Sequence, residues 1–206
     1  PKVLQVHAIG LDWAIATEYV EGPTLAVLMA RASGAARQTL WDRFVALQRQ
    51  VLTQSAPGLP DMKDKFNARI SALGRVADPA RRIEATIRYE LHVALDRMPS
   101  HTKLCHGDFL PENIIVAADG REFVLDWSHA TLGNGAADAA HTYLSLYLTG
   151  RRTEAAYYLK AYAKATDTAE QYIRSWFPVV SAGLLLQAET PADIAFLTKQ
   201  IQLIAV

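Results

Sequence analysis

The chain has 206 residues, of which half are apolar, and its 21 basic residues balance 21 acidic ones. A chain of this length forms one large domain or two small ones, and its apolar content is enough to bury a substantial core. The balanced charge provides no electrostatic footprint for nucleic acid or for an anionic membrane, so neither class of partner is expected.

The first two elements are expected to be strands at 3–9 and 13–20, joined by a short turn at 10–12. The chain starts at Pro1 and reads as a strand almost at once. Natural proteins rarely begin inside an element. We therefore expect this chain to be a piece of a longer protein.

Helical patterns dominate the rest of the chain. Thr24 is a suitable N-cap for a short helix, and residues 36–54 place apolar side chains at the spacings of an amphipathic helix. Further helices are expected at 61–74, 79–97, 136–148, 153–164, 168–187 and 191–204. The apolar stretch 179–186 is too short to span a bilayer. A single cysteine and no signal-peptide pattern indicate a cytoplasmic protein without intramolecular disulfides.

Residues 101–126 change to short β segments. Residues 114–116 and 123–125 flank Asp119-Gly120, and an Asp-Gly pair is a strong hairpin signal. The sequence therefore predicts an α+β fold: a mostly helical domain with one β-hairpin inserted in its middle and a short strand remnant at its start.

The residues around this hairpin are suited to phosphoryl transfer. That reaction needs one carboxylate that orients the acceptor hydroxyl and receives its proton, and oxygen ligands that hold Mg²⁺ between the phosphates. Four residues separate Asp108 from Asn113, and Asp126 follows the hairpin. This is the arrangement of kinase catalytic loops.

The turn also predicts how these residues pair. If Asp119 and Gly120 are the two central residues of a tight turn, Asn113 lies opposite Asp126, with Cβ atoms about 4.5–5.5 Å apart. Both side chains would then reach one metal ion. A wider loop centred on the same point would keep this pairing, whereas a bulge would disrupt it.

Three segments resemble one known superfamily. Residues 106–113, with His-Gly-Asp followed by Asn, are similar to the catalytic loop of the aminoglycoside phosphotransferase and choline kinase superfamily. Residues 126–138 resemble its metal-binding segment with the structural aspartate that follows, and residues 18–22 resemble its interlobe hinge. The three matches cover about residues 13–140, and the helical tail agrees only in general style.

The resemblance implies a protein-kinase-like fold, in which residues 1–22 are the end of the N-terminal lobe and the hinge. Residues 23–206 would be the helical C-terminal lobe with the catalytic and metal-binding loops. By this resemblance, Asp108 would be the catalytic base, and Asn113 and Asp126 would be the Mg²⁺ ligands. Glu18 would offer its backbone C=O and Val20 its backbone N–H to the adenine of ATP. GTP is the other possible phosphoryl donor.

Two further residues are expected to support the site structurally. His106 is expected to hold the loop by hydrogen bonding, in preference to transferring protons. Asp138 is expected to receive amides of the loop or of a helix N-terminus. The sequence departs from the superfamily at Asn134 and Gly135, where Asp and Pro are common, and at 110–112, where His-Pro-Gly is frequent.

The largest departure is upstream. The superfamily needs a nucleotide-covering loop and a strand lysine paired with a helix glutamate, and nothing before Glu18 supplies them. Lys2 is too close to the hinge for that position. We therefore expect the isolated chain to be inactive and its partner to be a missing N-terminal lobe of the same parent protein, about a hundred residues long.

The leading function is ATP-dependent transfer of a γ-phosphoryl group to a hydroxyl of a small molecule. One alternative is a nucleotide-binding, pseudokinase-like module, which would not need Asp108. Another is a metal-dependent hydrolase that uses His106, Asp108 and Asp126. A protein kinase is disfavoured because Gly107 stands where such kinases have Arg, and no Ala-Pro-Glu segment follows.

The sequence leaves the acceptor open among aminoglycosides, choline or ethanolamine, other amino-alcohols, sugars and thiosugars. By the resemblance, the C-terminal helices would form the acceptor pocket. Trp176 and several tyrosines could cage a quaternary ammonium, and acidic residues could attract an amine: Glu154, Asp167, Glu170, Glu189 and Asp193. Residues of these kinds more often belong to solvated helix faces or to ordinary packing.

Overall fold

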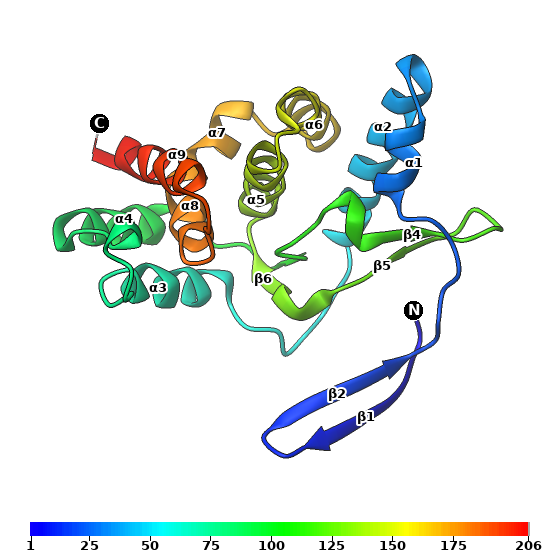
Figure 1. Ribbon diagram of the computed structural model, residues 1–206, viewed down its shortest axis with the longest axis horizontal. Helices are drawn as coiled ribbons and strands as arrows, with labels where there is room; N and C mark the ends of the chain where they lie inside the picture. The colour runs from blue at the N-terminus through cyan, green and yellow to red at the C-terminus, as the bar shows by residue number, and fades with distance from the viewer. Residues whose placement is uncertain (206) are drawn as a thin grey trace. The chain divides into compact units, whose positions relative to one another are not determined.

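The computed structural model describes residues 1–205, and Figure 1 shows its elements. They are mostly helices with a few short strands, which confirms the predicted α+β class. The chain forms two compact units. The first contains residues 1–44 and 110–127, and the second contains residues 45–109 and continues from residue 128. Within the described residues, no helix is both long and apolar enough to cross a lipid bilayer.

The first unit begins with an antiparallel hairpin of β1 (Val3–Ile9) and β2 (Asp12–Thr17). Its apolar side chains are exposed on both faces: Ile9 is 63% exposed on one face, and Trp13 73% and Ile15 63% on the other. A two-stranded hairpin alone is marginally stable in water. This hairpin therefore carries more apolar surface than its own fold buries.

The first unit continues with helices and a second hairpin. The predicted N-cap is confirmed, since the Thr24 side chain accepts a 3.3 Å hydrogen bond from the Val27 amide at the start of α1 (Leu25–Arg31). α2 (Gly34–Val51) begins in this unit, and its residues from Val45 onward belong to the second unit. The second hairpin, of β4 (Ile114–Val116) and β5 (Glu122–Val124), packs on α1 through β4 (Figure 1).

The register of the second hairpin differs from the prediction by one residue. Ile114 pairs with Val124, and the Leu125 amide donates to the Asn113 carbonyl at 2.8 Å. Asn113 is therefore opposite Leu125, and its predicted pairing with Asp126 is wrong. The cause is the loop: the Ala117 amide bonds to the Arg121 carbonyl, which leaves three loop residues with Gly120 at φ +81° in place of a two-residue turn.

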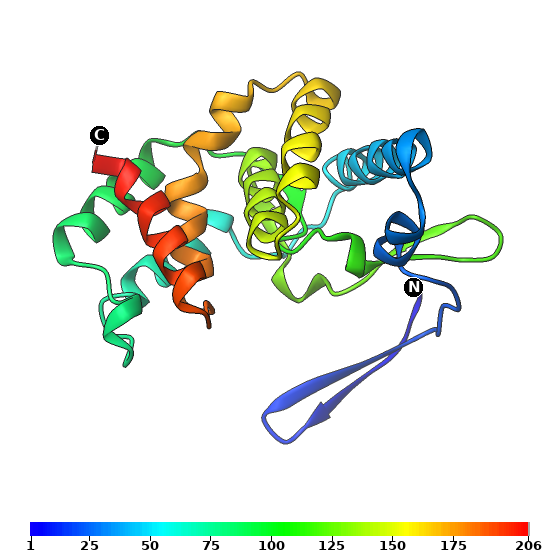
Figure 2. The same cartoon turned by 45° about the horizontal axis from the view of Figure 1, so that its top comes forward.

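The second unit arranges helices around a short antiparallel ladder of β3 (Lys103–Cys105) and β6 (Thr131–Gly133). α5 packs against α6, and α8 against α9, which both views show side by side (Figures 1 and 2). Besides the end of α2, the helices of this unit include α3 (Met62–Ala72), α4 (Ala85–Arg97), α5 (Gly135–Leu148), α6 (Arg152–Thr166), α7 (Glu170–Ser175), α8 (Phe177–Leu185) and α9 (Pro191–Gln202).

Two predicted helices are each divided in the structure. The segment predicted as one helix at 168–187 is α7 and α8, with a break at Trp176. Pro178 lies in the first turn of α8 and has no N–H to continue the hydrogen bonding of α7. The segment predicted at 79–97 is a 3₁₀ turn at Pro79–Arg81 followed by α4.

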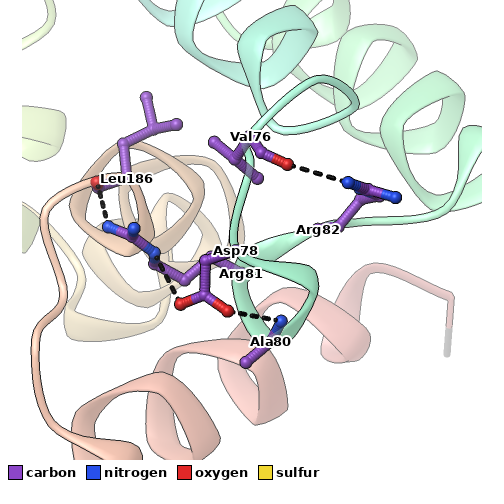
Figure 3. A network of polar contacts seen from close by, with 6 residues as sticks. All are labelled: Val76, Asp78, Ala80, Arg81, Arg82 and Leu186. Carbon is purple, nitrogen blue, oxygen red and sulfur yellow. Dashed lines mark hydrogen bonds and ion pairs between the residues drawn. The ribbon is translucent and has the colours of Figure 1, made fainter.

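That 3₁₀ turn is held by a network of polar contacts (Figure 3). The Asp78 side chain caps the turn by accepting from the Ala80 amide at 3.0 Å, and it pairs with Arg81 Nε at 3.2 Å. Arg81 also donates to the Leu186 carbonyl at 2.9 Å, just beyond the end of α8. Helix ends leave carbonyls without intrahelical partners, so this contact attaches the turn to the end of α8.

Candidate active site

The predicted catalytic loop leaves β3 directly, in the second unit. Cys105 pairs with Thr131 in the ladder, and the side chain of Phe109 is buried at the other end of the loop. The Thr142 hydroxyl of α5 donates to the Phe109 carbonyl at 2.8 Å. The loop is thus anchored at both ends, and Asp108 lies between these anchors with its side chain half-buried.

Gly107 is in the left-handed region, at φ +79°. A Cβ atom at this position would lie 2.4 Å from the His129 carbonyl oxygen. Both the backbone conformation and the close approach therefore require glycine before Asp108.

Asp138 holds this loop from the first turn of α5. Its Oδ1 accepts a 2.7 Å hydrogen bond from the Gly107 amide, and its Oδ2 accepts a 3.1 Å bond from Gln48 Nε2. The Tyr158 hydroxyl in turn donates to Gln48 Oε1 at 2.6 Å. The side chains of all three residues are buried. The arrangement supports a structural role for Asp138, and it includes Gln48 and Tyr158, which no sequence motif indicates.

His106 and Cys105 are both buried next to the loop. His106 Nδ1 accepts a hydrogen bond from the Asp108 amide at 3.2 Å, so this ring nitrogen carries no proton. The contact supports a loop-holding role for His106. Burial, followed by the negative charge of Asp138, raises the pKa of the Cys105 thiol well above its ordinary value. A thiolate nucleophile is therefore disfavoured at this position.

The two predicted metal ligands belong to the first unit. Asn113 ends a one-turn 3₁₀ helix, Pro111–Asn113, and is half-buried, whereas Asp126 is exposed. Because Leu125 bonds to the Asn113 backbone, the two residues lie at the same end of the hairpin. Asp126 has φ +57°, so the strand alternation that the prediction used no longer applies to it.

The donor chemistry of these two residues fits Mg²⁺. The ion takes oxygen ligands and is bound through one or two protein groups together with waters and substrate phosphates. Among the described residues, no group of three or more His, Cys, Asp and Glu side chains is placed to hold a metal ion. Asn113 and Asp126 would supply an amide oxygen and a carboxylate.

The predicted hinge follows β2. The Glu18 amide donates to the Lys2 carbonyl, and the Glu18 side chain accepts from the Lys2 amide, both at 2.9 Å. Within residues 1–205, neither the Glu18 carbonyl nor the Val20 amide has a hydrogen-bond partner. Within the described part of the chain, the two backbone groups predicted to hydrogen-bond with adenine therefore form no hydrogen bond with the protein itself.

A cavity of about 200 Å³ adjoins Asp108 within the second unit. Its polar lining includes Arg69 from α3, His141 and Ser145 from α5, and Gln187. A smaller cavity of about 30 Å³ is lined by Arg69, His141 and other residues of α3 and α5, together with Gly107, His129 and Thr131. The sequence did not associate Arg69 with the site, because α3 lies far from the catalytic loop along the chain.

His141 is a half-buried titratable residue that lines both cavities. Among the described residues, its Nδ1 has no hydrogen-bond partner. Burial lowers the pKa of His141 from its ordinary 6.5 to about 4; the Asp138 charge opposes this shift, while Arg69 reinforces it. The imidazole is therefore neutral at pH 7.

This shift predicts an acid sensitivity of the fold. Between pH 6.5 and 4 the unfolded chain binds a proton at His141 and the folded chain does not, so stability falls as the pH falls through this range. Between pH 7 and pH 4.5, we expect the free energy of unfolding to fall by about 2–3 kcal/mol more in the wild type than in His141→Gln. Urea unfolding at both pH values measures this, with the exposed His101→Gln as control. Equal losses in wild type and His141→Gln would contradict the prediction.

Comparison with known proteins agrees with the resemblance. The model of the phosphotransferase enzyme family (APH) matches residues 1–172. Comparison with curated protein sequences yields no match.

Solved structures of similar fold include a choline kinase and aminoglycoside phosphotransferases. Choline kinase LicA from Streptococcus pneumoniae superposes with a TM-score of 0.61 at 15% identity, over 99% of this chain and 74% of that one. A thermostable mutant of aminoglycoside phosphotransferase APH(4)-Ia, in ternary complex with AMP-PNP and hygromycin B, superposes with a TM-score of 0.66 at 17% identity. The superposition covers 99% of this chain and 75% of that one. The GDP complex of aminoglycoside 2'-phosphotransferase-IIIa superposes with a TM-score of 0.59 at 14% identity, over 99% of this chain and 74% of that one. At these identities the likeness establishes the shared fold.

Proposed function

Because the chain belongs to the phosphotransferase enzyme family, we propose that its parent protein transfers the γ-phosphoryl group of ATP or GTP to a hydroxyl of a small molecule, with Asp108 as the base. Transfer to a hydroxyl acceptor is the reaction class of the family. The observation that carries the role of Asp108 is its placement: a half-buried carboxylate on an anchored loop, at the wall of a cavity.

In the proposed mechanism, Asp108 orients the acceptor by accepting a hydrogen bond from its hydroxyl. The hydroxyl oxygen forms a bond to the γ-phosphorus as the bond from that phosphorus to the β,γ-bridging oxygen breaks, and the hydroxyl proton passes to Asp108. The nucleoside diphosphate leaves with the bridging oxygen. The contacts of Gly107 and Asp138 hold the loop in place before the reaction, which lowers the cost of aligning the acceptor.

The nucleotide would be held by three groups. Mg²⁺, when bound by Asn113 and Asp126, would neutralise phosphate charge. Glu18 and Val20 would offer a carbonyl and an amide to the base, and their lack of partners within residues 1–205 supports this role.

We also propose that the nucleotide-covering loop and the phosphate-binding lysine come from an N-terminal lobe of the parent protein. The exposed apolar faces of the β1–β2 hairpin support this, because strands of such a lobe would cover them. The division at residue 22 between lobes belongs to the same proposal.

The test is transfer of radiolabelled γ-phosphate by the parent protein to a panel of hydroxylated amines, sugars and acids, with and without Mg²⁺. We expect Mg²⁺-dependent transfer to one acceptor class. Binding of nucleotide without transfer to any acceptor would favour a binding module. Metal-dependent hydrolysis that needs no nucleotide donor would favour the hydrolase alternative.

A further inference from the structure

The cavity next to Asp108 contains a cation without a partner. Arg69 lies on α3 with its side chain half-buried, and within residues 1–205 its guanidinium makes no hydrogen bond or ion pair. Its side chain passes close to α8, since a Cβ atom at Gly183 would lie 3.2 Å from Arg69 Nη1. Removing a charged group from water without pairing it costs stability, so this placement requires a reason other than folding.

A second cation lies one helical turn away on the same face of α3. Lys65 lines the smaller cavity together with Arg69, and its Nζ donates to the neutral His129 carbonyl at 2.9 Å. Burial, and then the charge of Arg69, lowers the pKa of Lys65. Like charges at this spacing destabilise a helix. Two partly buried cations side by side, neither paired with an acid, favour an anionic ligand.

Among the described residues, the carboxylates that line the two cavities form no ion pair with these cations. They are Asp108 and Asp138. Both oxygens of Asp138 are occupied by Gly107 and Gln48, and Asp108 is needed for the acceptor hydroxyl. The two carboxylates of the described lining therefore already serve in holding the loop and in binding the hydroxyl. His141 is neutral, as derived above.

The amine-binding residues that the sequence suggested lie elsewhere. Trp176 is buried in the core at 1% exposure, so it does not form a cage for a quaternary ammonium. None of the five suggested acidic residues lines either cavity in the described structure: Glu154, Asp167, Glu170, Glu189 and Asp193.

We infer that the acceptor is an alcohol that also carries a carboxylate or phosphate group, with Arg69 binding this oxyanion while Asp108 holds the hydroxyl. This inference rests on the proposed function for the role of Asp108. The planar guanidinium can donate two parallel hydrogen bonds to either kind of oxyanion. An amine-bearing acceptor would meet a cation at this position.

The inference is tested with acceptors that differ only in one group. Hexose, pentose and three-carbon scaffolds are each offered to the parent protein as neutral, amino, carboxylate and phosphate forms, so that the last two distinguish the sources of the oxyanion. We expect transfer to an anionic form at a kcat/KM that Arg69→Gln lowers roughly 100-fold, mainly through KM. Arg69→Lys should recover part of this loss, and the exposed Arg75→Gln should change nothing. Preferred transfer to neutral or amino forms, unaffected by Arg69→Gln, would overturn the inference and leave the proposed function intact.

If no compound is phosphorylated, that result counts against the proposed function. A binding measurement then tests the anion site separately. Titration of inorganic phosphate and of glucuronate into the parent protein is followed by calorimetry. Binding to the wild type and to Arg75→Gln that is lost in Arg69→Gln supports the anion site on its own. Absence of binding to the wild type refutes it.

Discussion

Asp108→Asn in the parent protein is expected to lower kcat for phosphoryl transfer by about a thousandfold, within the range usual for loss of a positioned general base. The substitution keeps the shape of the side chain and removes its ability to take the hydroxyl proton. The Asp108 backbone contact to His106 is retained, because it is made by the amide. Steady-state kinetics with saturating nucleotide measures the change, and nucleotide KM should change by less than about threefold.

The control for this variant is Asp96→Asn, which removes an exposed carboxylate near the end of α4 that lines neither cavity. It should retain wild-type kcat. A loss of less than tenfold in Asp108→Asn, with unchanged unfolding, would remove Asp108 from the role of base and favour the binding-module alternative.

Asp138→Ala is expected to destabilise the second unit by about 3–5 kcal/mol. The substitution removes the acceptor of both the Gly107 amide and Gln48 Nε2. Each buried donor left without a partner costs about 1–3 kcal/mol. Guanidinium chloride unfolding of the chain measures the change in free energy.

Two milder variants test this explanation. Asp138→Asn retains one acceptor oxygen and should cost less than Asp138→Ala. Tyr158→Phe removes only the hydroxyl that donates to Gln48 and should cost about 1 kcal/mol. A loss below 1 kcal/mol for Asp138→Ala, or a larger loss for Tyr158→Phe, would show that the network does not stabilise the loop as the geometry indicates.

Local signals in the sequence were sufficient for most elements. The Thr24 cap, the amphipathic spacing of residues 36–54 and the Asp119-Gly120 turn each act over a few residues, and each element is present in the structure. These local signals did not predict details that depend on the exact length of a loop. The three-residue loop shifted the second hairpin by one position, and a left-handed backbone at Asp126 ended its alternation.

The sequence by itself determined the family and the identity of the groups suited to the chemistry, because the loop that carries Asp108 and Asn113 is continuous in the chain. Only the tertiary structure decided what surrounds them. Gln48, Arg69 and His141 come from helices far apart in sequence, and they reach the loop through the packing of α2, α3 and α5. Such contacts depend on the burial of whole helix faces, which no short motif records. The character of the cavity next to Asp108 was therefore decided by packing.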